Sequence, residues 1–160
     1  MSYPMEDQAP ADMMAPPPVA NVGEARPFRI ARNGGRPLRF SGAELGMAMS
    51  YTPEIPYWYE INLYRTSSGA FVLAIRLFHI SDQKTDTVEA WEFDSLEDAL
   101  WKIESYDPGA DVDVALKQDL DRMTPADLAA EMLELKARIA GIRHHYRSLA
   151  GEFLGTLDAA

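Results

Sequence analysis

The chain has 160 residues, of which 47% are hydrophobic and 25% are charged; its formal net charge is -10 and it contains no cysteine. This composition excludes a wholly disordered chain, and the length suits one compact domain with attachments. The lack of cysteine excludes disulfides, thiolate metal sites and cysteine nucleophiles. The start lacks the pattern of a signal peptide and no segment is apolar enough to span a bilayer, so we expect a cytoplasmic protein without membrane contact.

The charge is distributed unevenly along the chain. Residues 1–25 sum to -4, residues 26–39 to +5, residues 40–81 to -1, residues 82–121 to -10 and residues 122–160 to 0. An acidic centre repels a phosphate backbone, which disfavours nucleic-acid binding by the surface as a whole. The same centre would suit a basic partner, so an acidic, DNA-mimic-like inhibitor remains one alternative.

The first 25 residues are rich in Pro and Ala and predict a disordered tail. Order is expected to begin near Phe28. Two short arms, residues 28–32 and 36–40, flank Asn33-Gly34-Gly35, and this predicts a β-hairpin because Asn and Gly tolerate a positive φ.

Residues 43–51 are ambiguous. Large apolar residues alternate with small or polar ones, as in a strand with one apolar face. Ser41 and Glu44 have the spacing of a capping box, which would start a helix instead. Two internal glycines would each cost a helix about 1 kcal/mol, so the pattern favours the strand.

Three further strands are predicted at residues 58–65, 71–80 and 87–93. The second of them is apolar at nearly every position, which indicates a central strand covered on both faces. Turns rich in Ser, Gly and Asp separate the strands and predict an antiparallel meander. A helix should follow from Asp94 or Ser95 as N-cap and end before Asp107-Pro108-Gly109.

The expected fold is therefore α+β. Residues 26–107 should form a four- to five-stranded antiparallel meander sheet covered by one helix, and an acidic connector, residues 108–123, leads to a long C-terminal helix, residues 124–158. Thr124, Pro125 and Asp127 occupy its N-cap, N1 and N3 positions. A helix of about 50 Å exceeds a strand of about 30 Å, so the helix should overhang the sheet.

The long helix carries an unbroken heptad stripe, which predicts a coiled-coil-like homo-oligomer. Its a and d positions are Leu128, Met132, Leu135, Ile139, Ile142, Tyr146, Leu149 and Phe153. The alternative is a helix folded back over its own sheet. In a parallel pair Glu131 would attract Lys136, whereas Arg138 would repel Arg143, so charge does not fix the orientation.

Two other groups of residues are candidates for binding. Five cations without an intervening acid, which could contact nucleic acid or another anion through bidentate bonds, are Arg26, Arg29, Arg32, Arg36 and Arg39. They could equally neutralise the acidic segment. Aromatic residues that could contact a partner on an open sheet face, or fill the core, are Tyr51, Tyr57, Trp58, Tyr59 and Tyr64.

The sequence carries no catalytic motif. Adjacent His144 and His145 would point about 100° apart on a helix and cannot jointly hold a metal. The acidic pair Asp111 and Asp113 lacks the Gly and Glu positions of an EF-hand. We therefore predict a non-enzymatic interaction or adaptor module with a protein partner and without metal or cofactor. The alternative is a small nucleic-acid-associated regulator that uses the arginine-rich hairpin.

Overall fold

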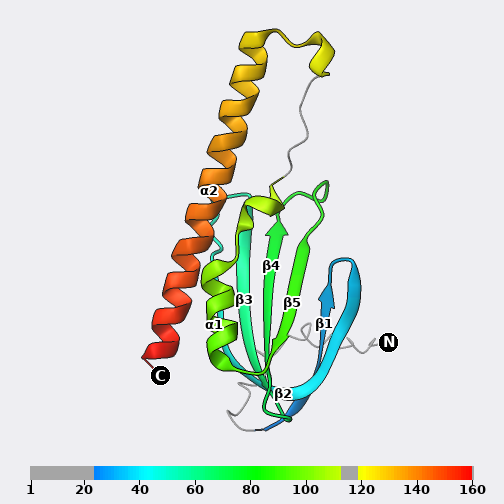
Figure 1. Ribbon diagram of the computed structural model, residues 1–160, viewed down its shortest axis with the longest axis vertical. Coiled ribbons are helices and arrows are strands. Elements are labelled where there is room, and N and C mark those ends of the chain that lie inside the picture. The colour runs from blue at the N-terminus through cyan, green and yellow to red at the C-terminus, as the bar shows by residue number, and fades with distance from the viewer. Residues whose placement is uncertain (1–23, 113–118, 160) are drawn as a thin grey trace, which may run out of the picture.

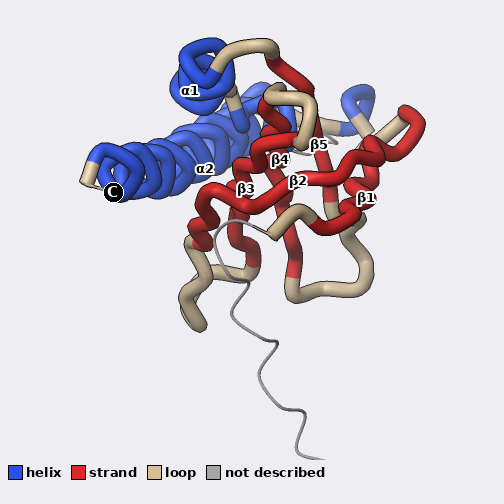
Figure 2. The backbone as a smooth tube through the Cα atoms, turned by 90° about the horizontal axis from the view of Figure 1, so that it is seen from below, coloured by secondary structure: helices blue, strands red, loops and turns tan. Residues whose placement is uncertain are grey.

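A computed structural model describes residues 24–112 and 119–159 of the chain. It contains a five-stranded antiparallel sheet in meander order: β1 (Arg26–Arg32), β2 (Gly35–Met49), β3 (Tyr57–Thr66), β4 (Phe71–His79) and β5 (Thr87–Phe93). Helices α1 (Leu96–Ser105) and α2 (Pro125–Asp158) lie on one face of this sheet (Figures 1 and 2). The predicted α+β meander is confirmed, although both helices cover the sheet where one was expected.

Local sequence signals set most of the element ends. Gly34 and Gly69, with φ of 66° and 90°, make the turns after β1 and β3. Ser95 caps α1, since its Oγ accepts the Asp98 N–H at 3.1 Å. Two short 3-10 segments, η1 (Pro108–Asp111) and η2 (Leu120–Arg122), lie between the helices.

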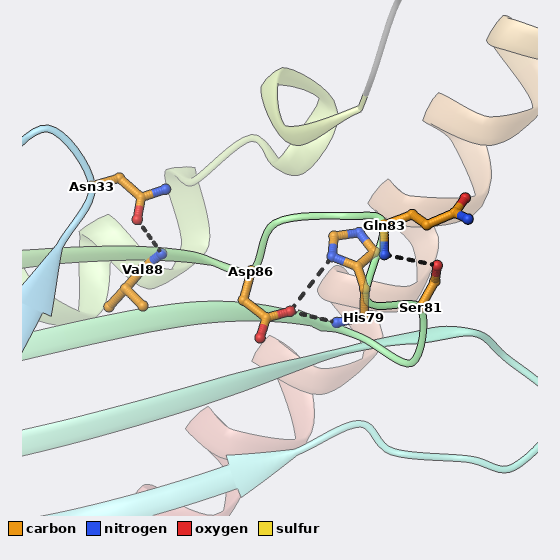
Figure 3. A network of polar contacts seen from close by, with 6 residues as sticks. All are labelled: Asn33, His79, Ser81, Gln83, Asp86 and Val88. Carbon is orange, nitrogen blue, oxygen red and sulfur yellow. Dashed lines mark hydrogen bonds and ion pairs between the residues drawn. The ribbon is translucent and has the colours of Figure 1, made fainter.

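Strand β2 is one long strand where the sequence indicated a hairpin arm followed by a separate segment. Its first part pairs with β1, where Arg26 lies opposite Gly42, and its second part pairs with β3, where Met49 lies opposite Glu60. The β1–β2 hairpin curls over the face of the sheet that the helices leave free. It reaches β5, where Val88 N donates to Asn33 Oδ1 at 3.1 Å (Figure 3). The sheet is therefore a half-barrel.

The curled sheet buries apolar residues on both faces. Under the helices, the core joins inward residues of β3 and β4 to both helices: Tyr59, Ile61, Leu63, Leu73, Ile75, Leu77, Ala99, Ile103, Ile142, Tyr146, Leu149, Ala150 and Phe153. Under the hairpin, a smaller core contains Ile30, Tyr64, Val72, Ala74 and Ala90. Strand β4 contributes to both cores, which confirms that it is central and doubly covered.

Among the described residues, no helix is long and apolar enough to cross a membrane. Most of the predicted tail, residues 1–23, and the middle of the predicted connector, residues 113–118, lie outside the described residues.

Candidate interaction surfaces

Helix α2 has two halves with different surroundings (Figure 1). It begins beyond the end of the sheet at a complete capping box, in which Thr124 Oγ1 accepts the Asp127 N–H at 3.1 Å and Asp127 accepts the Thr124 N–H at 3.2 Å. This cap is the one that the sequence predicts. Because it satisfies backbone donors locally, the helix can start without support from the sheet.

The second half of α2 folds back over the sheet. Four of the eight stripe residues are buried there: Ile142, Tyr146, Leu149 and Phe153. A close fit depends on Gly46 of β2, because a Cβ at that position would lie 3.1 Å from the Phe153 ring. Tyr146 Oη also donates to the Ile103 carbonyl at 2.7 Å, which joins α2 to α1. In this half, the structure shows the packing that the fold-back alternative describes.

The first half of α2 extends beyond the sheet with its stripe largely uncovered. Leu128 is 36% exposed and Met132 45% exposed, whereas Leu135 and Ile139 are half-buried. Leu133 is more exposed still, at 68%, but it lies off the stripe. The same heptad pattern therefore serves an internal core in one half and presents an apolar surface in the other.

The two halves meet where η1 contacts the helix. Arg143 donates to both carboxylate oxygens of Asp107, from Nε at 2.8 Å and from Nη2 at 2.7 Å. The hydrogen bonds from Arg143 and from the Gly109 backbone lower the pKa of Asp107 to about 2. This bidentate pair anchors α2 at the level where it leaves the sheet.

Asp111 of η1 has a structural role. Its Oδ2 accepts hydrogen bonds from Tyr59 Oη and from Tyr106 Oη, each at 2.8 Å. Burial, and then the charge of Asp111, raise the pKa of both tyrosines, so both remain hydroxyl donors. The Tyr146 ring lies 5.2 Å from that of Tyr106. Asp113, which the sequence paired with Asp111, lies outside the described residues.

Two of the five arginines form a cross-strand pair. Arg29 lies directly opposite Arg39 in the β1–β2 register, and both are exposed on the outer face of the hairpin. Within the described part of the chain, neither is in an ion pair. Like charges directly opposite one another repel, so this pair is suited to an anion.

The other three arginines do not join this pair. The Arg26 guanidinium lies over the Phe28 ring, 4.7 Å from its centroid. Arg32 Nε donates to the Arg36 carbonyl at 2.8 Å. These contacts stabilise the ends of the hairpin and do not enlarge the Arg29–Arg39 surface.

Some of the aromatic residues predicted to contact a partner lie in the core, and others lie at the surface. Tyr59 and Tyr64 are buried, and Tyr57 is half-buried on the helix side. Trp58 lies on the opposite face, where its ring stacks on Phe78 at 5.3 Å. Of the four strand aromatics, Trp58 is therefore the one presented on the free face.

Sequence reasoning missed how much apolar surface surrounds Trp58. Tyr51 meets its ring edge-on at 5.3 Å, and Met47 and Met49, each 52% exposed, lie on the same face of β2. We call Met47, Met49, Tyr51, Trp58 and Phe78 the open strip. The alternation of residues 43–51 predicted an apolar face, but the small residues Gly46 and Ala48 are the ones that face α2.

No protein-family model, curated protein or solved structure matches this chain. Its functional interpretation therefore rests on the surfaces described above.

Proposed function

We propose that the protein is a non-enzymatic interaction module that self-associates through the first half of α2 and presents its sheet domain to a protein partner. The supporting observation is that the apolar stripe continues past the sheet, with Leu128 and Met132 exposed. A helical segment as short as the first half of α2 is marginal in water without tertiary contacts, and burial of each of these two side chains would contribute roughly 1.5–3 kcal/mol. A partner helix would supply this burial.

A second copy of the chain is the partner that best fits the overhang. Its stripe is apolar in every copy, so two overhangs bury like surfaces against one another. Glu131 and Lys136 flank the stripe at g and e positions, and opposite charges can meet across a pair. Arg143, whose repulsion of Arg138 would oppose a parallel pair, is already held by Asp107 at 2.7 Å.

The open strip is the surface proposed for the protein partner. It lies on the face of the sheet opposite α2, so pairing of helices leaves it accessible. Beside it, residues 43–49 of β2 pair with β3 on one side, while the described ladder with β1 ends at Gly42 on the other. A strand edge of this kind, flanked by exposed apolar residues, can accept an extended segment of another protein.

Sedimentation equilibrium tests the self-association. We expect the full chain to form dimers or larger oligomers as its concentration rises. The double variant Leu128→Glu/Met132→Glu should stay monomeric while its circular dichroism shows an intact fold. Leu133→Glu is the matched control, because Leu133 is exposed but lies off the stripe. A monomeric full chain, or equal disruption by the control, would exclude the proposal.

The Arg29–Arg39 pair favours nucleic-acid association as a second candidate function. Its test is the affinity for duplex DNA and RNA over a series of salt concentrations. The double variant Arg29→Gln/Arg39→Gln should weaken binding and reduce the salt slope by about 2, whereas Arg36→Gln should change both less. If the full chain does not bind at low salt, this candidate fails.

A further inference from the structure

The described residues line an open-sided cavity of about 640 Å³ between α2, the end of the sheet and the β4–β5 loop. Its apolar lining comes from Tyr57, Leu77, Val112 and Ile142. Small-molecule sites in proteins have volumes of roughly 300–1,000 Å³ and a mostly apolar lining with a few polar groups. The volume and the lining of the cavity fall within these ranges.

The loop at the mouth of the cavity is held by its own polar contacts (Figure 3). Asp86 Oδ1 accepts the backbone N–H of His79 at 2.8 Å, and Ser81 Oγ accepts the N–H of Gln83 at 3.2 Å. These contacts fold residues 81–86 back beside the end of β4. They place Gln83, Lys84 and Thr85 on the cavity wall.

The wall formed by α2 includes two small residues one turn apart. Ala137 and Gly141 line the cavity, and a Cβ built on Gly141 would meet no atom within 4 Å. Glycine is unfavourable in the interior of a helix, so helix stability does not explain its presence there. Its effect is to leave the cavity open on this side.

The cavity wall carries two cations. Lys84 comes from the loop and Arg138 from α2, and neither is in an ion pair with a described carboxylate. One carboxylate, Asp111, also lines the cavity, and its Oδ2 accepts hydrogen bonds from two tyrosine hydroxyls. Asp86, in the loop, accepts the backbone N–H of His79. In addition, the buried His79 Nδ1 has no hydrogen-bond partner among the described residues, although Asp86 Oδ1 lies 3.8 Å from it.

We propose that this cavity binds a small molecule with an anionic head, such as a carboxylate, on an apolar body. The head would lie between Lys84 and Arg138, where charge-assisted hydrogen bonds are available. The apolar body would occupy the space beside Leu77, Ile142 and Gly141. The inference does not depend on self-association, because the stripe residues Leu128 and Met132 do not line the cavity.

Calorimetric titration with decanoate tests the proposal, with decan-1-ol as the uncharged comparison. We expect the full chain to bind decanoate at one site and decan-1-ol at least tenfold more weakly, since one charge-assisted contact corresponds to about tenfold in affinity. The double variant Lys84→Ala/Arg138→Ala should lose about tenfold in decanoate affinity and leave decan-1-ol binding unchanged.

A matched pair of glycine substitutions tests the location. Gly141→Leu should fill the cavity and abolish binding of decanoate, whereas Gly155→Leu should not, although both glycines lie in α2 with open space around them. Thermal unfolding of each variant verifies its fold. The proposal is overturned if the full chain does not bind decanoate, if Gly141→Leu still binds it, or if Gly155→Leu loses as much affinity.

Discussion

Gly42 determines how β2 passes from one partner strand to the other. A Cβ at this position would lie 2.1 Å from the carbonyl oxygen of Arg65 in β3. The clash would be with backbone, which cannot move aside as the end of a flexible side chain can. The bend of the half-barrel therefore depends on a single missing methyl group.

Gly42→Ala should destabilise the protein by about 3 kcal/mol or more, because the strands would have to separate. Gly151→Ala is the matched control, since its Cβ would meet no atom within 4 Å. There, the higher helix propensity of Ala should stabilise the fold by up to about 1 kcal/mol. Urea unfolding measures both, and equal effects of the two substitutions would refute the role assigned to Gly42.

Asp111 joins three elements through the hydroxyls of Tyr59 and Tyr106, each 2.8 Å from its Oδ2. We expect Asp111→Asn to lower the free energy of unfolding by about 1–3 kcal/mol, because an amide accepts these bonds less well than a carboxylate. Asp82→Asn, in the exposed β4–β5 loop, should change it little. If Asp111→Asn unfolds at the same urea concentration as the unchanged chain, the tyrosine contacts do not stabilise the fold.

At the scale of elements, the Arg143–Asp107 pair should make the anchoring of α2 depend on pH. The pKa of Asp107 in the folded protein, about 2, lies below its ordinary value of 3.8. Its contribution to stability is therefore complete above about pH 4 and is lost as the pH falls towards 2. Both side chains are well exposed, so solvent keeps the contribution small.

Asp107→Asn should accordingly destabilise the protein near neutral pH and have a much smaller effect near pH 2. The measurement is the difference in free energy of unfolding between variant and unchanged chain, taken by urea titration over this range. Asp82→Asn is again the control. A difference that stays constant down to pH 2 would show that the Asp107 carboxylate does not act through this ion pair.

The sequence predicted elements best where the signals are local. Ser95 and Thr124 cap the helices as expected, because a cap depends on residues three positions apart. That β2 is one continuous strand could not be predicted from the sequence. It depends on the close contact of Gly42 with the backbone of Arg65, and these two residues are distant in the sequence. The heptad stripe fixed which face of α2 is apolar but not what covers it, since coverage depends on where the sheet ends.

The candidate sites were less predictable than the elements. The pairing of Arg29 with Arg39 follows from the predicted hairpin once its register is known. The cavity could not be predicted, because its lining comes from β3, β4, the β4–β5 loop, η1 and α2. In residues 43–51 the apolar face was predicted, but the close approach of α2 to Gly46 left that face open to solvent.

For the whole molecule, the two helices lie on one face of the sheet, and the overhang of α2 extends past the end of the sheet (Figures 1 and 2). The open strip lies on the opposite face. Pairing through the overhang therefore leaves both the open strip and the Arg29–Arg39 pair accessible. This arrangement explains how one chain could assemble and bind a partner at the same time. In this proposal the first half of α2 binds a second copy of the chain, and the second half packs on the sheet.

Hydrogen exchange at low and high protein concentration tests this division most directly. Amides of residues 128–139 should gain protection as the concentration rises, because they become buried between copies. Amides of residues 142–157 should be protected equally at both concentrations, because their partner is the sheet of the same chain. Protection of residues 128–139 that does not change with concentration would contradict the account.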